Sequence, residues 1–333
     1  MDNNISDLLS KEIEKLMENK FFFKTPSNLK ILAYSASYIL LILLGVLLNI
    51  EIIAAFLSVF PLTYVLGAKG LRFYIPLSIC GGVILSLVSS PNVIFLFGVH
   101  MIIAYIIYKT IYVRASKPFL IVAVTTLLFL AIALYIFLSI KLGNITIDRQ
   151  QILEFINSYV NSMVEMNRNV DKNLVLESFS SLQRSFPVTL FIMLFVYSLA
   201  LIQYTLSLLS REYVIIPAFP KFSRIMLSPK IGNMYIVMNV VILFMEMDAG
   251  NSSYSFWNIL LQNISGVLSL AFILNGLFTA YFFIEQRSTS KSNIGKPVVF
   301  ALMLIFSPIF ELLGLVDSIF KIREGYIIMK RGR

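Results

Sequence analysis

The sequence FPVTLFIMLFVYSLALIQYTLSLLS, Phe186–Ser210, runs without a single charged side chain. An α-helix rises about 1.5 Å per residue, so about 20 apolar residues are enough to cross a hydrocarbon core that is ~30 Å thick. This stretch is therefore predicted to be a membrane-spanning helix. The rest of the chain can be oriented from the segment that follows it.

That following segment, REYVIIPAFPKFSRIMLSPKIG (Arg211–Gly232), is rich in basic side chains, with Glu212 as its one acidic residue. The basic residues are Arg211, Lys221, Arg224 and Lys230. Short loops rich in Lys and Arg stay on the cytoplasmic side of a membrane. Pro217, Pro220 and Pro229 prevent one continuous helix. We therefore expect an irregular basic loop on the inner membrane surface, between a front and a rear block of spans.

The composition predicts the same class of protein. Hydrophobic residues make up 58% and charged residues 14% of the 333 residues, whereas soluble domains average about 45–50% and 25%. We expect an all-α, polytopic transmembrane helical bundle with eight to nine hydrophobic segments and a cytoplasmic N-terminus, in contact with the lipid bilayer. The net charge of +9 arises in short loops beside spans, so it does not indicate a nucleic-acid partner. Cys80 is the single cysteine, which excludes a disulfide framework.

Basic loops recur after every second predicted span, and this alternation sets the expected organisation. We expect a cytoplasmic amphipathic lead-in over residues 1–28, a six-span front block over 29–210 with an external helical insertion over 141–185, a basic cytoplasmic loop over 211–232, a rear block of two spans plus a broken last segment over 233–320, and a basic tail over 321–333. The lead-in either lies in the headgroup region or is a solvated helix.

The insertion over 141–185 is the one long polar segment, and its charges balance. Ile152, Phe155 and Tyr159 share one face of a predicted helix, and a second short helix is expected after Asp171. The segment is either a cap folded over the outer mouth of the front block or an amphipathic spacer on the lipid surface.

The last hydrophobic segment contains ionisable residues that a straight crossing would bury. Glu311 lies about one turn after Pro308, and a carboxylate at the centre of a span costs roughly 2.5–3.5 kcal/mol. A bend at Pro308 would return Glu311 and Asp317 toward the inner face, with Arg323 close to Asp317 and Arg333 inside. These residues form either a gate or partner-docking element, or an internal salt bridge that fixes the fold.

His100 is the only histidine, and it lies within a predicted span. An ionisable group inside a membrane is a candidate for ligand binding, although a neutral imidazole bonded to a neighbouring helix is a common structural solution. No second histidine, cysteine or carboxylate stands at helical spacing from it, so no metal site is expected. No cofactor is expected either, and the sequence lacks GxxxxGK[ST], HExxH, GxSxG and CxxC motifs.

Asn263 and Asn275 are amide side chains within rear-block spans. Amides of this kind form hydrogen bonds between helices, typically worth about 0.6–2 kcal/mol. Small residues at Ser265, Ser269 and Gly276 favour close helix packing. We therefore assign both asparagines a structural or gating role.

The chain resembles the YybS-like family of bacterial multi-span membrane proteins, whose shared domain has no assigned function. The residues that support the resemblance are FPLTYVLGAKG (Phe60–Gly70), the Phe186–Pro187 entry with its basic loop, Asn263, Asn275–Gly276 and GLVDSIFKIREG (Gly314–Gly325). The resemblance implies a bacterial cytoplasmic membrane. It also implies a distant similarity of the front half to the substrate-binding S subunits of energy-coupling-factor transporters, which are six-span bundles with both ends inside.

Two functions are favoured by the sequence, and neither is enzymatic; a third, an intramembrane enzyme, is disfavoured because the sequence shows no paired catalytic groups. The first is a solute-binding or transport-type membrane subunit that works with a membrane or ATPase partner, or with an ion gradient. The second is a non-catalytic scaffold or regulator of the cell envelope. A cavity in the front block lined by polar and aromatic side chains would favour the first, and a solid core there would favour the second.

Overall fold

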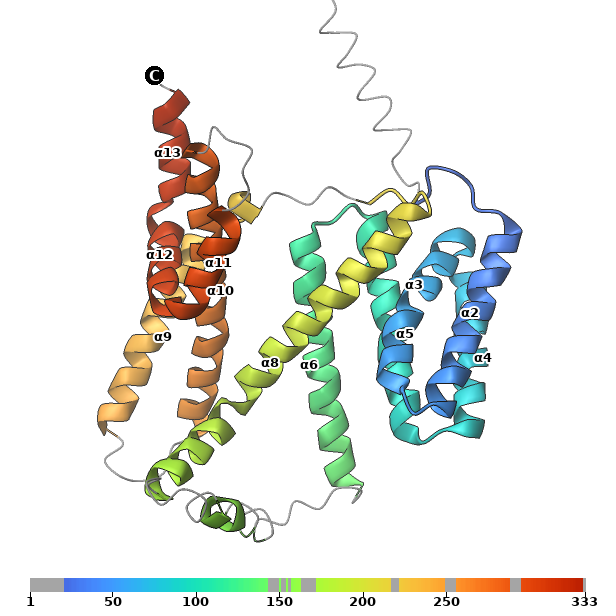
Figure 1. The fold of residues 1–333 in the computed structure, drawn as a ribbon, viewed down its shortest axis with the longest axis horizontal. Coiled ribbons are helices and arrows are strands. Elements are labelled where there is room, and N and C mark those ends of the chain that lie inside the picture. The colour runs from blue at the N-terminus through green and yellow to red at the C-terminus, as the bar shows by residue number, and fades with distance from the viewer. Residues whose placement is uncertain are drawn as a thin grey trace, which may run out of the picture. The chain divides into compact units, whose positions relative to one another are not determined.

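The structure is a computed structural model, and it describes residues 21–142, 150, 154, 157–162, 172–216, 222–248, 256–287 and 295–331. Within these ranges the named elements are helices (Figure 1). They are α2 (Asn28–Leu47), α3 (Glu51–Lys69), α4 (Leu71–Val88), α5 (Pro91–Tyr112), α6 (Lys117–Lys141), α8 (Lys172–Arg211), η1 (Phe222–Arg224), α9 (Pro229–Asp248), α10 (Phe256–Arg287), α11 (Gly295–Ile305), α12 (Ser307–Phe320) and α13 (Ile322–Arg331).

In the described part of the chain, 7 helices are long and apolar enough to cross a membrane. The bent pair of α11 and α12 gives up to 8, and α9 adds a shorter apolar stretch, Pro229–Met245. The all-α polytopic class is thereby confirmed. The cytoplasmic position of the N-terminus stays a prediction. Most of the lead-in (1–20), much of the insertion over 141–185 and the end of the tail (332–333) lie outside the described residues.

The chain forms two compact units, divided within α8. Unit 1 comprises residues 1–146 and 193–219, and unit 2 comprises residues 147–192 and 220–333. The sequence suggested a boundary at the basic loop after residue 210. In the structure the first half of α8 packs with the rear helices, because Asn263 and Gly266 of α10 contact it around Val188.

In unit 1, α3 is the enclosed helix and α2, α4 and α5 pack around it. Residues 58–66 of α3 are buried without a break. Small residues permit close contact here: a Cβ added at Gly45 of α2 would lie 2.5 Å from the Cβ of Ala54, and one at Gly67 would lie 2.2 Å from the Phe21 ring. Part of the FPLTYVLGAKG motif is thus explained by burial and by the space that Phe21 requires.

One end of unit 1 is closed by polar contacts between distant parts of the sequence. The backbone N–H of Phe23 donates to the carbonyl of Tyr213 at 2.8 Å, and that of Ile215 donates to the carbonyl of Phe21 at 3.0 Å. Glu212 pairs with the Lys30 ammonium at 2.7 Å and accepts from the Tyr34 hydroxyl at 3.0 Å. The chain before α2 is therefore fastened to the chain after α8.

The sequence predicted a span from Phe186, and the apolar stretch Arg184–Arg211 is long enough to cross a membrane. The sequence also predicted a separate short helix after Asp171, and this separation was wrong. The structure has one helix, α8, which continues through Pro187. A proline lacks the N–H of the helical ladder, and its ring disturbs the preceding turn. The side chain of Asn263 bridges the disturbed turn: its Nδ2 donates to the Arg184 carbonyl at 2.9 Å, and its Oδ1 accepts from the Val188 N–H at 3.2 Å. A partner helix thus supplies the polar contacts that let the helix continue.

In unit 2, the backbones of α10 and α12 come into close contact at two glycines, Gly276 and Gly314. A Cβ added at Gly276 would lie 1.9 Å from the Phe310 carbonyl oxygen, and one at Gly314 would lie 2.0 Å from that of Phe272. The sequence predicted a bend near Pro308, and α11 and α12 meet at 107° around Phe306. The break falls just before the proline because Pro308 occupies the first turn of α12, where its missing N–H costs nothing.

Candidate functional site

Unit 1 contains a cavity of about 450 Å³ between α5, α6 and α8, with the start of α3 at its edge. Its lining is largely apolar. The aromatic residues in the lining are Phe95, Tyr135 and Tyr197, and its polar side chains include Asn92 and His100. A volume of this size lies within the range of about 300–1,000 Å³ that is typical of small-molecule sites.

His100 of α5 is buried, and both of its ring nitrogens have partners. Nδ1 lies 2.8 Å from the Leu96 carbonyl oxygen, and Nε2 lies 2.7 Å from the Tyr197 hydroxyl of α8. A carbonyl oxygen only accepts hydrogen bonds, so Nδ1 must be the nitrogen that bears a hydrogen. Because a charged imidazole is costly in a membrane interior, we assign the ring as neutral. Nε2 is then an acceptor, and Tyr197 donates to it.

This assignment determines what the cavity offers to a ligand. The hydrogen of the Tyr197 hydroxyl is used by His100, whereas the lone pairs of its oxygen remain able to accept. At this point the cavity wall therefore presents an acceptor among apolar side chains. Such a wall suits a mostly apolar molecule with one hydrogen-bond donor, such as a hydroxyl, an amine or an amide N–H.

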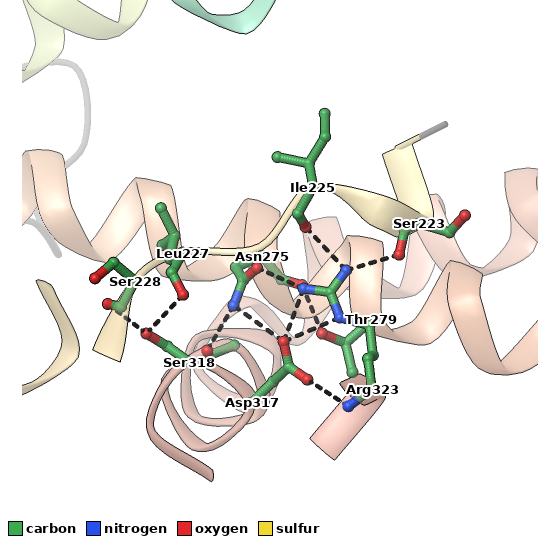
Figure 2. Close-up of polar contacts among 10 residues, drawn as sticks. Ser223, Ile225, Leu227, Ser228, Asn275, Thr279, Asp317, Ser318 and Arg323 are labelled. Atoms are coloured by element: carbon green, nitrogen blue, oxygen red, sulfur yellow. Dashed lines mark hydrogen bonds and ion pairs between the residues drawn. The ribbon is translucent and has the colours of Figure 1, made fainter. Parts of the chain in front are cut away.

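A second polar centre lies in unit 2, where Arg323 is buried together with Asp317 (Figure 2). The guanidinium contacts the carboxylate of Asp317 through Nη2 at 2.7 Å and through Nε at 3.0 Å. Nη2 also donates to the side-chain oxygen of Asn275 at 2.8 Å. The guanidinium is planar with several fixed donors, so it can hold α10 and α12 at once.

The same guanidinium also fixes the chain that leads into α9. Nη1 donates to the carbonyl oxygens of Ser223 and Ile225, each at 2.9 Å. Ser318 of α12 adds a hydrogen bond to the Ser228 carbonyl at 3.0 Å (Figure 2). The backbone turns at Lys321, whose φ is 51°, and this turn brings Arg323 back toward Asp317. Because its donors are used within the protein, the geometry favours the internal salt bridge over a docking element.

A third polar centre surrounds Glu311 of α12. One carboxylate oxygen accepts a hydrogen bond from the Tyr235 hydroxyl of α9, and the other accepts from Ser269 of α10 at 2.7 Å. Next to this group, Ser265 donates to the side-chain oxygen of Asn239 at 3.0 Å. Glu311 makes no ion pair within the described ranges, in contrast to Asp317 on the same helix.

A family model described as "Predicted membrane protein (DUF2232)" matches residues 35–318 of the chain, from α2 to α12. The chain belongs to this family. No curated protein and no solved structure matches it. The family establishes a membrane protein and agrees with the several apolar helices of the fold. The finer resemblance to the YybS-like family, and that of the front half to transporter S subunits, stays a prediction.

The matched segment includes all of the residues singled out from the sequence except Arg323, and the structure divides these residues between the two units. His100 lines the cavity of unit 1. Asp317, Asn275 and Arg323 form one network in unit 2, although Arg323 itself lies just beyond the matched range. Glu311 lies in a separate network, and Asn263 contacts α8. Among the described residues no group of three or more His, Cys, Asp or Glu side chains could hold a metal ion.

Two tyrosines that take part in these centres were not predicted. Tyr197 and Tyr235 lie in apolar stretches where a tyrosine resembles any other large aromatic residue. Their hydroxyls become informative only when their partners are known, and those partners are 97 and 76 residues away in the sequence. The sequence alone could have indicated them only through a search of every other span for a hydroxyl donor to each buried ionisable residue.

Proposed function

We propose that this protein is a solute-binding or transport-type membrane subunit, and that the cavity of unit 1 is its binding site. The observation that supports the proposal most is the His100–Tyr197 pair in the wall of an otherwise apolar cavity of about 450 Å³. The ligand that fits is a small, mostly apolar molecule with one hydrogen-bond donor.

Each part of this proposal follows from the cavity wall. The aliphatic and aromatic lining favours an apolar ligand, because removing apolar surface from water lowers the free energy by about 25 cal/mol per Å². Tyr197 orients the ligand by accepting its donor. The role that we propose is binding rather than catalysis. Active transport would draw on a partner ATPase or on an ion gradient, in a bacterial cytoplasmic membrane.

The alternative role, a scaffold or regulator of the cell envelope, predicted a solid core in the front block. The cavity among α5, α6 and α8 supports the binding role instead, since aromatic and polar side chains meet in its wall. The polar contacts at the end of unit 1 suit either role, because they are internal to the unit.

The proposal can be tested by photolabelling the purified protein in lipid nanodiscs. The probe is a benzyl alcohol bearing a trifluoromethyl-diazirine, which combines an aromatic body with one hydroxyl donor. Its methyl ether serves as a probe without the donor. We expect the alcohol to label peptides from α5, α6 and α8 more strongly than the ether does. Ala131→Phe, which fills the cavity, should abolish this labelling.

Ala133 provides the matched control, because it lies exposed on the same helix two residues further on. Ala133→Phe adds the same ring outside the cavity and should leave labelling unchanged. Equal labelling by the alcohol and the ether, with no effect of Ala131→Phe, would mean that the cavity takes up lipid chains without selection. That result would contradict the proposal.

A further inference from the structure

We propose that unit 2 contains a second binding site, a pocket between α8 and α10 that holds the phosphate group of a membrane phospholipid. The site is separate from the solute cavity, which lies in unit 1, and it does not depend on the binding role proposed for that cavity. Its ligand is an oxyanion that a lipid headgroup carries at the membrane surface.

The pocket has a volume of about 230 Å³ and lies between the beginning of α10 and the part of α8 that belongs to unit 2. At one end of it the two helices are in contact, because a Cβ added at Gly266 would lie 3.0 Å from a methyl carbon of Val188. The other lining residues are polar: Ser181, Arg184, Ser185, Gln262 and Asn263. The cavity of unit 1 is largely apolar, so the two sites suit different ligands.

The lining of this pocket carries a positive charge. Arg184 lines it, and none of the described lining residues is acidic. An arginine stays ionised in a protein. Its guanidinium is held in place, since Nε donates to the Ser180 carbonyl at 3.1 Å and Nη2 donates to the Ser180 hydroxyl at 2.9 Å. Because Ser180 lies one turn before Arg184, the guanidinium points away from the contact of Val188 with Gly266. The pocket therefore suits an anion.

Neighbouring side chains add hydrogen-bond donors to the charge. The Ser181 hydroxyl and the Gln262 amide can both donate, and they line the pocket from different helices. The Asn263 amide is not counted among these donors, because it bridges the turn at Pro187. A guanidinium with hydroxyl and amide donors matches the oxygens of a phosphate group, and hydrogen bonds assisted by charge are stronger than neutral ones.

The position of the pocket along the two helices favours the phosphate of a lipid. Arg184 is the first residue of the apolar stretch Arg184–Arg211, so it lies where the predicted span begins. On α10, the exposed Trp257 lies between one and two turns before Gln262. Tryptophan is typical of the membrane–water interface. Both helices thus place the pocket near the headgroups, and basic pockets between transmembrane helices bind lipid headgroups.

Native mass spectrometry of the full-length protein in detergent tests the proposal through lipid binding. The probe is dioleoylphosphatidylglycerol, and dioleoylglycerol has the same chains without the phosphate. We expect the phospholipid to bind with the higher affinity. Arg184→Gln should lower this affinity by about tenfold or more, because it removes charge-assisted hydrogen bonds, and Arg184→Lys should retain part of it. Arg211→Gln is the matched control, at an exposed arginine on the other end of α8, and should change nothing.

A second pair of variants leaves Arg184 in place. Ser181→Phe adds a ring at the pocket and removes a donor, so it should also lower the affinity for the phospholipid. Leu182→Phe adds a ring at the next position, which is exposed outside the lining, and should have no effect. Equal binding of the two lipids, or an affinity that neither Arg184→Gln nor Ser181→Phe lowers, would overturn the proposal. Displacement of the phospholipid by an equal concentration of inorganic phosphate would also overturn it, because the ligand would then be a soluble anion.

Discussion

The Tyr197 hydroxyl donates to Nε2 of His100 across 2.7 Å, and this hydrogen bond joins α8 to α5 within unit 1. The one histidine is buried, and each of its ring nitrogens has a partner. We assign its ring as neutral because a charged imidazole is costly in a membrane interior. The same pair also places polar side chains in the wall of a largely apolar cavity. One contact thus serves the packing of two helices and the recognition that we propose.

Removing the Tyr197 hydroxyl should destabilise the protein. Tyr197→Phe leaves Nε2 of His100 buried without a donor, and an unsatisfied buried group costs about 1–3 kcal/mol. The free energy of unfolding in detergent micelles, measured by reversible denaturation, should fall by this amount. Tyr204→Phe is the control: it is the same change on the same helix, at a half-buried ring that packs against Phe56. Equal effects of the two variants would mean that the His100 contact contributes nothing.

Asn263 should matter because of Pro187. Asn263→Ala removes the side chain that satisfies the Arg184 carbonyl and the Val188 N–H, and we expect a loss of about 1–3 kcal/mol in unfolding free energy. In a Pro187→Ala background the helical ladder can close by itself, so Asn263→Ala should cost markedly less. A double-mutant cycle with the four proteins measures this coupling. A coupling energy of zero would show that Asn263 does not compensate for the proline.

The buried ion pair of unit 2 should be sensitive to loss of either partner. Asp317→Asn leaves the Arg323 guanidinium without its counter-charge, and breaking a buried pair in this way costs about 3–5 kcal/mol. Glu324→Gln breaks an exposed pair with Lys321 and should cost about 0–1 kcal/mol. Thermal unfolding of both variants in detergent tests the difference. Similar melting temperatures for the two would contradict the assigned role of Arg323.

Sequence reasoning succeeded where an ionisable residue interrupted an apolar run. Glu311 and Asp317 indicated a bend because a straight span would bury them, and the structure bends at Phe306 and pairs Asp317 with Arg323. His100 indicated a polar contact for the same reason. Burying a charge in a membrane is so costly that one ionisable residue in an apolar segment is enough to predict a bend or a polar partner.

The rest depended on contacts between distant segments. The continuation of α8 through Pro187 depends on Asn263, 75 residues away from Val188, and a proline by itself predicts a break. The close contact of α10 with α12 requires Gly276 and Gly314 to face each other where the two helices cross. The sequence around each glycine does not indicate which helix it contacts. The cavity of unit 1 is a property of three helices and leaves no local signal.

The predicted orientation can be tested by cysteine labelling in intact cells, in a Cys80→Ser background because Cys80 is exposed. Phe222, within the basic loop, and Ser158, in the insertion, both lie exposed in the structure. If the basic loop is cytoplasmic, an impermeant thiol reagent should label Ser158→Cys and spare Phe222→Cys until the cells are opened. The reverse pattern would place the N-terminus outside.

The most direct measurement for the binding role is the small-molecule content of the protein purified from its own membranes, determined by mass spectrometry after extraction. Wild type and Ala133→Phe should retain the same small, mostly apolar molecule with a hydrogen-bond donor, and Ala131→Phe should lose it because the added ring fills the cavity. If all three proteins yield the same molecules, or bulk membrane lipids alone, the cavity is not a solute site and the proposed function is contradicted.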